Sequence, residues 1–135
     1  MFEKQKQKGK EMNERGKLGK EGEDRACAYL ETCGYRIVER NFRCRSGEID
    51  IVAAEERGGI ICFVEVKTRR GCAFGLPKEA VDRRKQRKLC AAAKYYMLCH
   101  REYENCLLRM DVVEMLHLAS GIYVNHIKGA FGEVS

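Results

Sequence analysis

The chain has 135 residues, of which 44% are hydrophobic and 34% are charged, and it contains a single Pro. A chain of this size can form one compact domain and is too short for two independent cores, and its composition excludes a disordered or fibrous protein. The formal net charge is +6, from 26 Lys and Arg against 20 Asp and Glu. Such an excess attracts polyanions only where the basic residues are clustered.

The cysteines and the N-terminal residues bear on the compartment. Eight cysteines could form the disulfide framework of a secreted protein, but the first ten residues are mostly polar and lack the apolar core of a secretory signal. No stretch approaches the roughly 20 apolar residues that span a bilayer. We therefore expect a cytoplasmic protein without membrane contact, with reduced cysteines that are mostly small core residues. Neither the cysteines nor the three histidines have metal-ligand spacing.

Residues 1–16 carry many Lys and Gln and few apolar groups, so we predict a flexible basic arm followed by a single domain at 17–135. A solvated tail and a nucleic-acid contact are both open interpretations of this arm.

The domain begins with a helical pattern. Apolar residues recur at helical spacing over 18–33, and Gly34 follows as a C-terminal cap, which predicts a first helix. A loosely alternating run at 35–42 predicts a first strand, and a basic turn follows at 43–47.

Two β-rich runs at 48–54 and 60–68 predict a hairpin. A two-residue turn at 58–59 would pair Asp50 with Lys67 and direct the charged side chains of both strands to one face of the sheet. A three-residue loop without a bulge would direct them to opposite faces.

The remaining pattern completes an α/β domain. Residues 69–76 contain two glycines and predict a mobile loop, and Pro77 predicts the first turn of a helix over 78–103. Short β-type runs at 107–115 and 122–127 complete the sheet. We predict a mixed central β-sheet flanked by α-helices.

Three charged residues, Asp50, Glu65 and Lys67, interrupt strands that otherwise have a buried pattern. Two carboxylates beside a lysine suit a hard divalent cation, so we expect Asp50 and Glu65 to bind Mg²⁺ or Mn²⁺. Such a site hydrolyses phosphodiesters, with Lys67 steering the attacking water or neutralising the transition state. A cross-strand ion pair between Asp50 and Lys67, without any metal, is the structural alternative.

Other residues could extend this site. Glu48 lies two residues before Asp50 and therefore shares its face, which makes it a further candidate metal ligand. Glu23 in the first helix could supply another ligand or orient a water, and Gln86 could turn toward that water or a phosphate. A solvated surface position is the alternative for Glu23 and Glu48.

A dense basic run opens the second predicted helix and could neutralise several phosphates, although such a run is usually a solvated helix face. Its position one loop after the candidate catalytic strand favours phosphate positioning. The nucleic-acid-binding candidates are the basic residues of this run and of two turns: Arg45, Arg69, Arg70, Arg83, Arg84, Lys85, Arg87 and Lys88.

Several strings stand out along the chain: LGKEGE at 18–23, RSGEID at 45–50, FVEVKTR at 63–69 and FGLP at 74–77. Together they closely resemble the bacterial YraN-type family of predicted endonucleases, over roughly residues 18–131. That family is similar to archaeal Holliday-junction resolvases and to the wider restriction-endonuclease-like group. The basic arm and the high cysteine content depart from the family pattern.

The resemblance implies a restriction-endonuclease-like core, with acidic metal ligands at Asp50 and Glu65, the lysine at Lys67 and a helix glutamate at Glu23. By analogy, the substrate is branched or structured DNA. We expect a homodimer, because cutting two strands symmetrically requires two active sites. The alternatives are a non-catalytic nucleic-acid-binding accessory protein, whose Asp, Glu and Lys form a structural ion-pair network, and a protein-interaction module without nucleic-acid binding.

Overall fold

A computed structural model describes residues 14–70 and 81–132 of the chain. The predicted arm up to residue 13, the loop over 71–76 and the helix start at Pro77 lie outside the described residues. Helix α2 begins at Glu14, so the last three residues assigned to the arm are helical.

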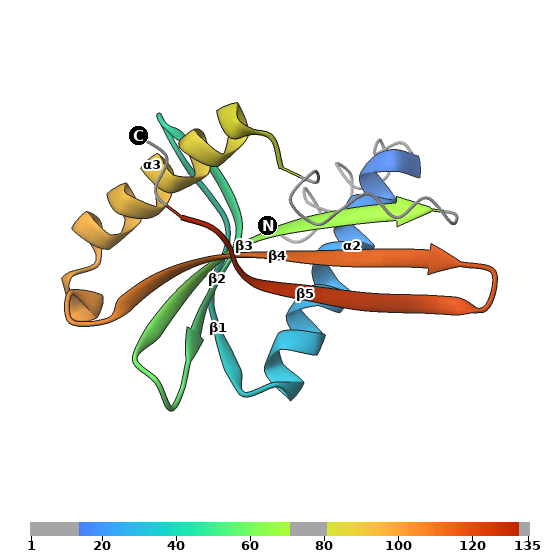
Figure 1. Ribbon diagram of the computed structural model, residues 1–135, viewed down its shortest axis with the longest axis horizontal. Coiled ribbons are helices and arrows are strands. Elements are labelled where there is room, and N and C mark those ends of the chain that lie inside the picture. Colours follow the sequence, from blue (N-terminus) through green and yellow to red (C-terminus); the bar gives the residue numbers. More distant parts are fainter. Residues whose placement is uncertain (1–13, 71–80, 133–135) are drawn as a thin grey trace, which may run out of the picture.

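The described residues form a five-stranded sheet in the order β1-β2-β3-β4-β5 (Figure 1). Strands β1 to β3 form an antiparallel meander, β3 and β4 are parallel, and β4 and β5 form an antiparallel hairpin. Parallel neighbours need a long crossover, and here it contains a helix. The predicted mixed sheet is therefore confirmed, with strands Tyr35–Cys44 (β1), Gly47–Glu55 (β2), Ile60–Arg70 (β3), Leu107–Leu118 (β4) and Gly121–Phe131 (β5).

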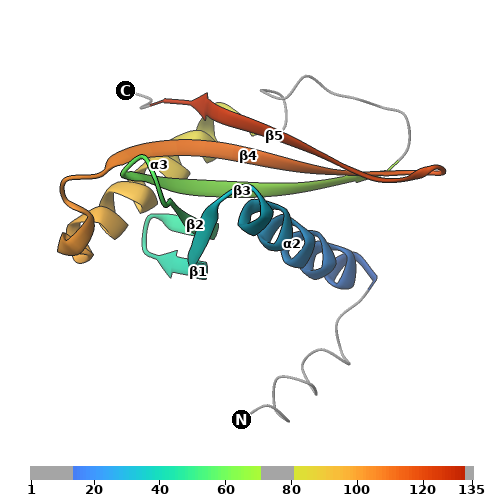
Figure 2. The same ribbon diagram turned by 90° about the horizontal axis from the view of Figure 1, so that it is seen from below.

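Two α-helices of the described chain, α2 (Glu14–Thr32) and α3 (Arg83–Cys99), pack on the sheet through separate core clusters. The helices lie toward opposite ends of the molecule (Figures 1 and 2). The cluster at α3 includes Val52, Phe63, Ala92, Ala93 and Tyr96. The cluster at α2 includes Ala26, Leu30, Ile51, Val64 and Val113. Neighbouring residues of β2 and β3 thus enter different cores, as alternation along a strand requires.

The second helix is shorter than the sequence pattern predicts. It begins at Arg83 because the side chain of Asp82 accepts a 2.8 Å hydrogen bond from the main-chain N–H of Lys85, which makes Asp82 the N-cap. At its other end the helix stops at Cys99, and a separate 3₁₀ turn, η2 (Arg101–Tyr103), follows. The prediction of one helix over 78–103 is therefore wrong at both ends within the described residues.

The predicted hairpin of β2 and β3 is present, but its turn is neither of the two lengths considered from the sequence. Glu55 pairs with Ile60, so four residues form the turn, and Gly59 adopts a left-handed conformation with a φ of 61°. The observed register differs by two residues from the one that a two-residue turn would give. Side chains alternate with a period of two, so this shift leaves every side chain on the predicted face, and the hydrophobic pattern alone cannot distinguish the two registers.

Strand β3 is longer than predicted. Arg69 and Arg70, which the sequence pattern assigns to a mobile loop, continue the parallel pairing with β4 as far as His117. The neighbouring strand supplies main-chain partners here, which outweighs the weak local preference of these residues.

Two glycines fix how α2 meets the sheet. Gly34 ends the α2 turn with a φ of 91°, which confirms its predicted role as a cap. Gly22 lies so close to β3 that a Cβ atom there would overlap Oγ1 of Thr68. This close approach holds the N-terminal half of α2 beside the end of β3 that carries Glu65 and Lys67.

Candidate functional site

The centre of the site is a pair of carboxyl groups on adjacent strands. Ile51 and Val64 are the last paired residues of β2 and β3, and Asp50 and Glu65 come one step beyond them. Glu65 is only 4% exposed, and Oδ2 of Asp50 accepts a 2.8 Å hydrogen bond from the main-chain N–H of Val66. Burial, together with the hydrogen bond and negative charge of Glu65, raises the pKa of Asp50 to about 8. Without a cation, Asp50 is therefore protonated at neutral pH.

Two lysines contact the same carboxylate oxygen. Nζ of Lys85 lies 2.5 Å from Oε2 of Glu65, and Nζ of Lys67 lies 3.6 Å from that atom. Burial would lower the pKa of Lys85, but the contact with Glu65 and the charges of Glu65 and Asp50 outweigh it, so that pKa is raised. The alternative to a metal site was an ion pair between Asp50 and Lys67. In the structure, Lys67 instead pairs with Glu65.

Two cavities open at this carboxyl pair, and Asp50, Glu65 and Lys85 line both. The larger, of about 520 Å³, lies between the β1–β2 turn and α3, and its walls are Gly47, Glu48, Asp50, Glu65, Asp82, Arg84, Lys85, Lys88 and Leu89. The smaller, of about 340 Å³, lies against α2 and is also lined by Gly19, Glu23, Val66, Lys67 and Thr68.

The structure brings both further acidic candidates to these cavities. Glu23 lies in the wall of the smaller one, and its Oε1 atom is 3.7 Å from Nη2 of Arg40. Burial raises the pKa of Glu23, although Arg40 and Asn41 oppose the shift. Glu48 lies in the wall of the larger cavity and makes a 3.6 Å ion pair with Arg43. Glu48 and Asp50 thus line the same cavity, as expected of two residues predicted to share one face of their strand.

Gln86 is not brought to the carboxyl pair. Its Nε2 atom donates a 2.9 Å hydrogen bond to the main-chain oxygen of Val81, and it lines neither cavity. The Gln86 side chain thus links the first turn of α3 to Val81, which precedes the helix.

The basic candidates occupy several environments. Arg84, Lys85 and Lys88 line the larger cavity, next to the turn that holds the exposed Arg45. The other candidates on α3, Arg83 and Arg87, are exposed, as is Arg70 at the end of β3. Arg69 differs from all of these, because its Nε atom pairs at 2.9 Å with the buried carboxylate of Glu114.

The donor set suits a hard divalent cation that keeps most of its water. Within the described ranges no three His, Cys, Asp or Glu side chains gather as a metal-binding group, so Asp50 and Glu65 act as a pair. Asp50 is protonated beside an adjacent carboxyl group and open cavities, so a cation can replace its proton, and Mg²⁺ typically binds through one or two carboxylates plus waters. The residues present therefore fit Mg²⁺ or Mn²⁺.

Comparison with known proteins identifies the family. Residues 22–115 match the model of a family described as "Uncharacterised protein family UPF0102". The chain belongs to this family. It is similar to a UPF0102 protein of Caldicellulosiruptor saccharolyticus, with 46% identity over 122 residues that cover 89% of this chain and 100% of the relative. A UPF0102 protein of Trichlorobacter lovleyi is 48% identical over 115 residues, covering 84% and 89% of the two chains.

A further UPF0102 protein, from Desulforamulus reducens, is 41% identical over 119 residues, which cover 87% of this chain and 97% of the relative. The family agrees with the resemblance found in the sequence motifs. In the described parts of the chain, no helix has the length and apolar character needed to cross a membrane.

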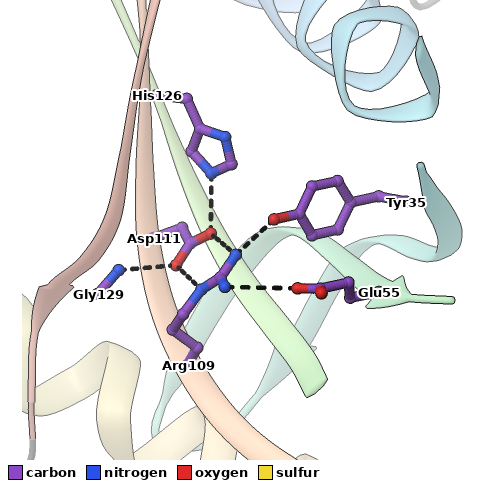
Figure 3. A network of polar contacts seen from close by, with 6 residues as sticks. All are labelled: Tyr35, Glu55, Arg109, Asp111, His126 and Gly129. Carbon is purple, nitrogen blue, oxygen red and sulfur yellow. Dashed lines mark hydrogen bonds and ion pairs between the residues drawn. The ribbon is translucent and has the colours of Figure 1, made fainter. Parts of the chain in front are cut away.

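Sequence reasoning missed a buried polar network on the α2 side of the sheet (Figure 3). Asp111 is fully buried and accepts hydrogen bonds from Arg109, from Nε2 of His126 at 2.8 Å and from the main-chain N–H of Gly129. Arg109 also donates to the hydroxyl of Tyr35 at 2.6 Å and pairs with Glu55. The available signal was an Asp between apolar residues of β4, where a charge needs a buried partner.

This network joins four strands, because its residues come from β1, β2, β4 and β5 and Arg109 reaches past β3. Nδ1 of His126 is buried and has no hydrogen-bond partner among the described residues. The carboxylate of Asp111 can only accept, so the proton of a neutral His126 lies on Nε2. We assign the network a structural role.

Proposed function

We propose that this protein is a metal-dependent endonuclease with a restriction-endonuclease-like core, which hydrolyses phosphodiester bonds in branched or structured DNA. One observation carries the proposal: the buried Glu65 lies beside the half-buried Asp50 and contacts two lysines, and both carboxyl groups line a cavity with a basic wall. Carboxylates for a cation and ammonium groups for a phosphate are the two requirements of this reaction.

Each side chain has a defined task in the proposed reaction. Asp50 and Glu65 would hold Mg²⁺ or Mn²⁺, and the chemistry that such a cation would supply is activation of water and neutralisation of phosphate charge. Lys67 and Lys85 neutralise the charge that grows on the phosphoryl oxygens. Hydrolysis forms one P–O bond to the oxygen of water and breaks one P–O bond to a sugar oxygen. The products are a phosphomonoester and a hydroxyl group.

The exposed basic residues around the larger cavity position the DNA backbone. Arg84 and Lys88 lie in the cavity wall, and Arg45 is exposed on the neighbouring turn. Contacts of this kind are independent of base sequence, which suits recognition of DNA shape. By analogy with resolvases, we propose that a homodimer in the cytoplasm cuts two strands.

A second candidate function also has a specific observation in its favour. The buried charge of Glu65 already has partners in the absence of metal, because Lys67 and Lys85 both pair with it. This is the arrangement expected of a non-catalytic nucleic-acid-binding accessory protein with a structural ion-pair network.

Cleavage assays distinguish the two candidates. We would incubate the full chain with labelled four-way junction, flap, single-stranded and duplex DNA, and with a matched RNA, in Mg²⁺, Mn²⁺ or chelator. The proposal predicts metal-dependent cleavage that falls by about 100-fold or more in Lys67→Ala. Arg101→Gln, in the turn η2 that follows α3, is the surface control. DNA binding without cleavage in any metal, unchanged by Lys67→Ala, would establish the accessory protein instead.

A further inference from the structure

Lys85 and Glu65 form the shortest ion pair of the site, yet the two side chains differ sharply in freedom. Glu65 is 4% exposed, whereas the side chain of Lys85 is 46% exposed. The main-chain N–H of Lys85 is fixed by the N-cap Asp82, so its Cα atom is held in place. A lysine has a flexible four-carbon stem, and its ammonium group can therefore leave Glu65 without any movement of α3.

The larger cavity offers a second position for the ammonium group of Lys85. Lys85 lines the larger cavity, whose wall also contains Arg84 and Lys88. A phosphate in that cavity would attract the Lys85 ammonium away from the carboxyl pair. Lys67, the second lysine, is farther from Glu65 at 3.6 Å and does not line the larger cavity. Of the two lysines, Lys85 is therefore the one that can contact both the carboxylate and a phosphate there.

Charge balance gives the direction of the movement. With both carboxyl groups ionised, Asp50 and Glu65 carry two negative charges, and Lys67 and Lys85 carry two positive charges. A divalent cation on the carboxylates would leave an excess of two positive charges, so Lys85 would be repelled from the pair. A phosphodiester anion in the larger cavity would then bind Lys85.

We propose that Lys85 is an exchangeable counter-ion of the site: it neutralises Glu65 in the free protein, gives up this position to a divalent cation, and then binds a phosphate of the nucleic acid. This inference rests on the proposed metal-dependent function and adds a regulatory step to it. Metal and nucleic acid bind cooperatively through Lys85, and the coupling is reciprocal.

Mn²⁺ binding to the full chain, measured by isothermal titration without nucleic acid, tests the exchange. Lys85→Met keeps an unbranched four-atom stem and removes the ammonium group, so it should bind Mn²⁺ about tenfold more tightly than the parent. Lys85→Arg retains the competing charge and should stay close to the parent. Lys94→Met, on the same helix but in the wall of a different cavity, is the matched control. Thermal melting verifies that each variant folds.

The second measurement is the affinity for a hydrolysis-resistant phosphorothioate duplex, with and without Mn²⁺. The parent should bind the duplex at least about fivefold more tightly when Mn²⁺ is present, and Lys85→Met should lose this gain. Equal Mn²⁺ affinities for the parent and Lys85→Met would overturn the exchange and leave the metal-dependent function standing. An absence of Mn²⁺ binding to every variant, with or without the duplex, would overturn both.

Discussion

The main-chain N–H of Val66 donates a 2.8 Å hydrogen bond to Oδ2 of Asp50, which joins β2 and β3 at the point where the carboxyl pair begins. This bond lowers the pKa of Asp50, but burial and Glu65 act more strongly in the opposite direction and raise that pKa from 3.8 to about 8. In the metal-free protein, Asp50 is therefore a proton-binding group whose affinity for protons is far higher in the folded state than in the unfolded state.

The free energy of unfolding should consequently fall as the pH rises from about 4 to about 8, because in this window the folded state binds a proton that the unfolded state has released. Asp50→Asn retains a donor toward Glu65 and an acceptor for Val66, and it removes this dependence. In chelator at about pH 9, the variant should be more stable than the parent by about 2 kcal/mol. Urea denaturation across this pH range measures the difference, and parallel pH profiles for the two proteins would contradict the assignment.

The close approach of α2 to β3 predicts opposite effects for two glycines of the same helix. Gly22→Ala should destabilise the protein by about 1–3 kcal/mol, because the new Cβ overlaps Oγ1 of Thr68. Gly19 has no neighbour within 4 Å of such a Cβ, so Gly19→Ala should stabilise the helix by up to about 1 kcal/mol. Adding Thr68→Ala to Gly22→Ala should recover much of the loss. A simple sum of the two single effects would argue against the contact.

The buried Asp111 network predicts a loss of stability in acid. Burial alone would raise the pKa of Asp111, but hydrogen bonds from His126, Arg109 and Gly129 outweigh it, so this pKa lies below its ordinary value of 3.8. Its contribution is complete above that ordinary value and is lost as the pH falls through the lowered folded-state pKa.

Asp111→Asn should therefore flatten the acid limb of the stability profile, and it should cost about 3 kcal/mol at neutral pH, because Arg109 loses its buried partner. Asp24→Asn, which removes an exposed ion pair with Arg40, should cost less than about 1 kcal/mol. Similar losses for the two variants would show that burial of Asp111 is not what matters.

The basic wall of the larger cavity predicts the salt dependence of DNA binding. Replacing Arg84 and Lys88 together by Gln should weaken binding to all sequences alike and reduce the slope of log K against log salt by about two. Arg101 lies in η2, after the other end of α3, and its side chain is 83% exposed, so Arg101→Gln should leave the slope unchanged. If the double variant keeps the slope of the parent, the DNA backbone does not bind in this cavity.

Sequence patterns predicted the elements of the fold well where burial is strong and periodic. The alternation in β2 and β3 placed Asp50 and Glu65 on one face for a two-residue turn, and the observed register, shifted by two residues, keeps them there. The ends of the helices and strands were harder to predict from the sequence, because they depend on particular contacts. Asp82 caps α3 through one side-chain hydrogen bond, and β3 continues to Arg70 because β4 lies beside it.

The candidate site was predicted in its acidic part and only partly in its basic part. Asp50 and Glu65 are neighbours on paired strands, so local alternation brings them together. The contact between Lys85 and Glu65 joins a helix to a strand across the crossover, and the spacing of residues within one element carries no information about it. Gln86 illustrates the same limit, since its bond to Val81 depends on how α3 begins.

The crossover between β3 and β4 also has a consequence for the order of folding. Strands β1 to β3 pair with their sequence neighbours, so this meander requires only short-range chain closure and leaves the ribosome before α3. At that stage Glu65 has only the more distant of its two lysine partners, Lys67, and burying its carboxylate is unfavourable. Docking of α3 brings Lys85 to Glu65, and it also packs Tyr96 against the apolar side chains of the sheet. Docking of α3 should therefore be the folding step that stabilises β2 and β3, with Asp50 and Glu65, in their native arrangement.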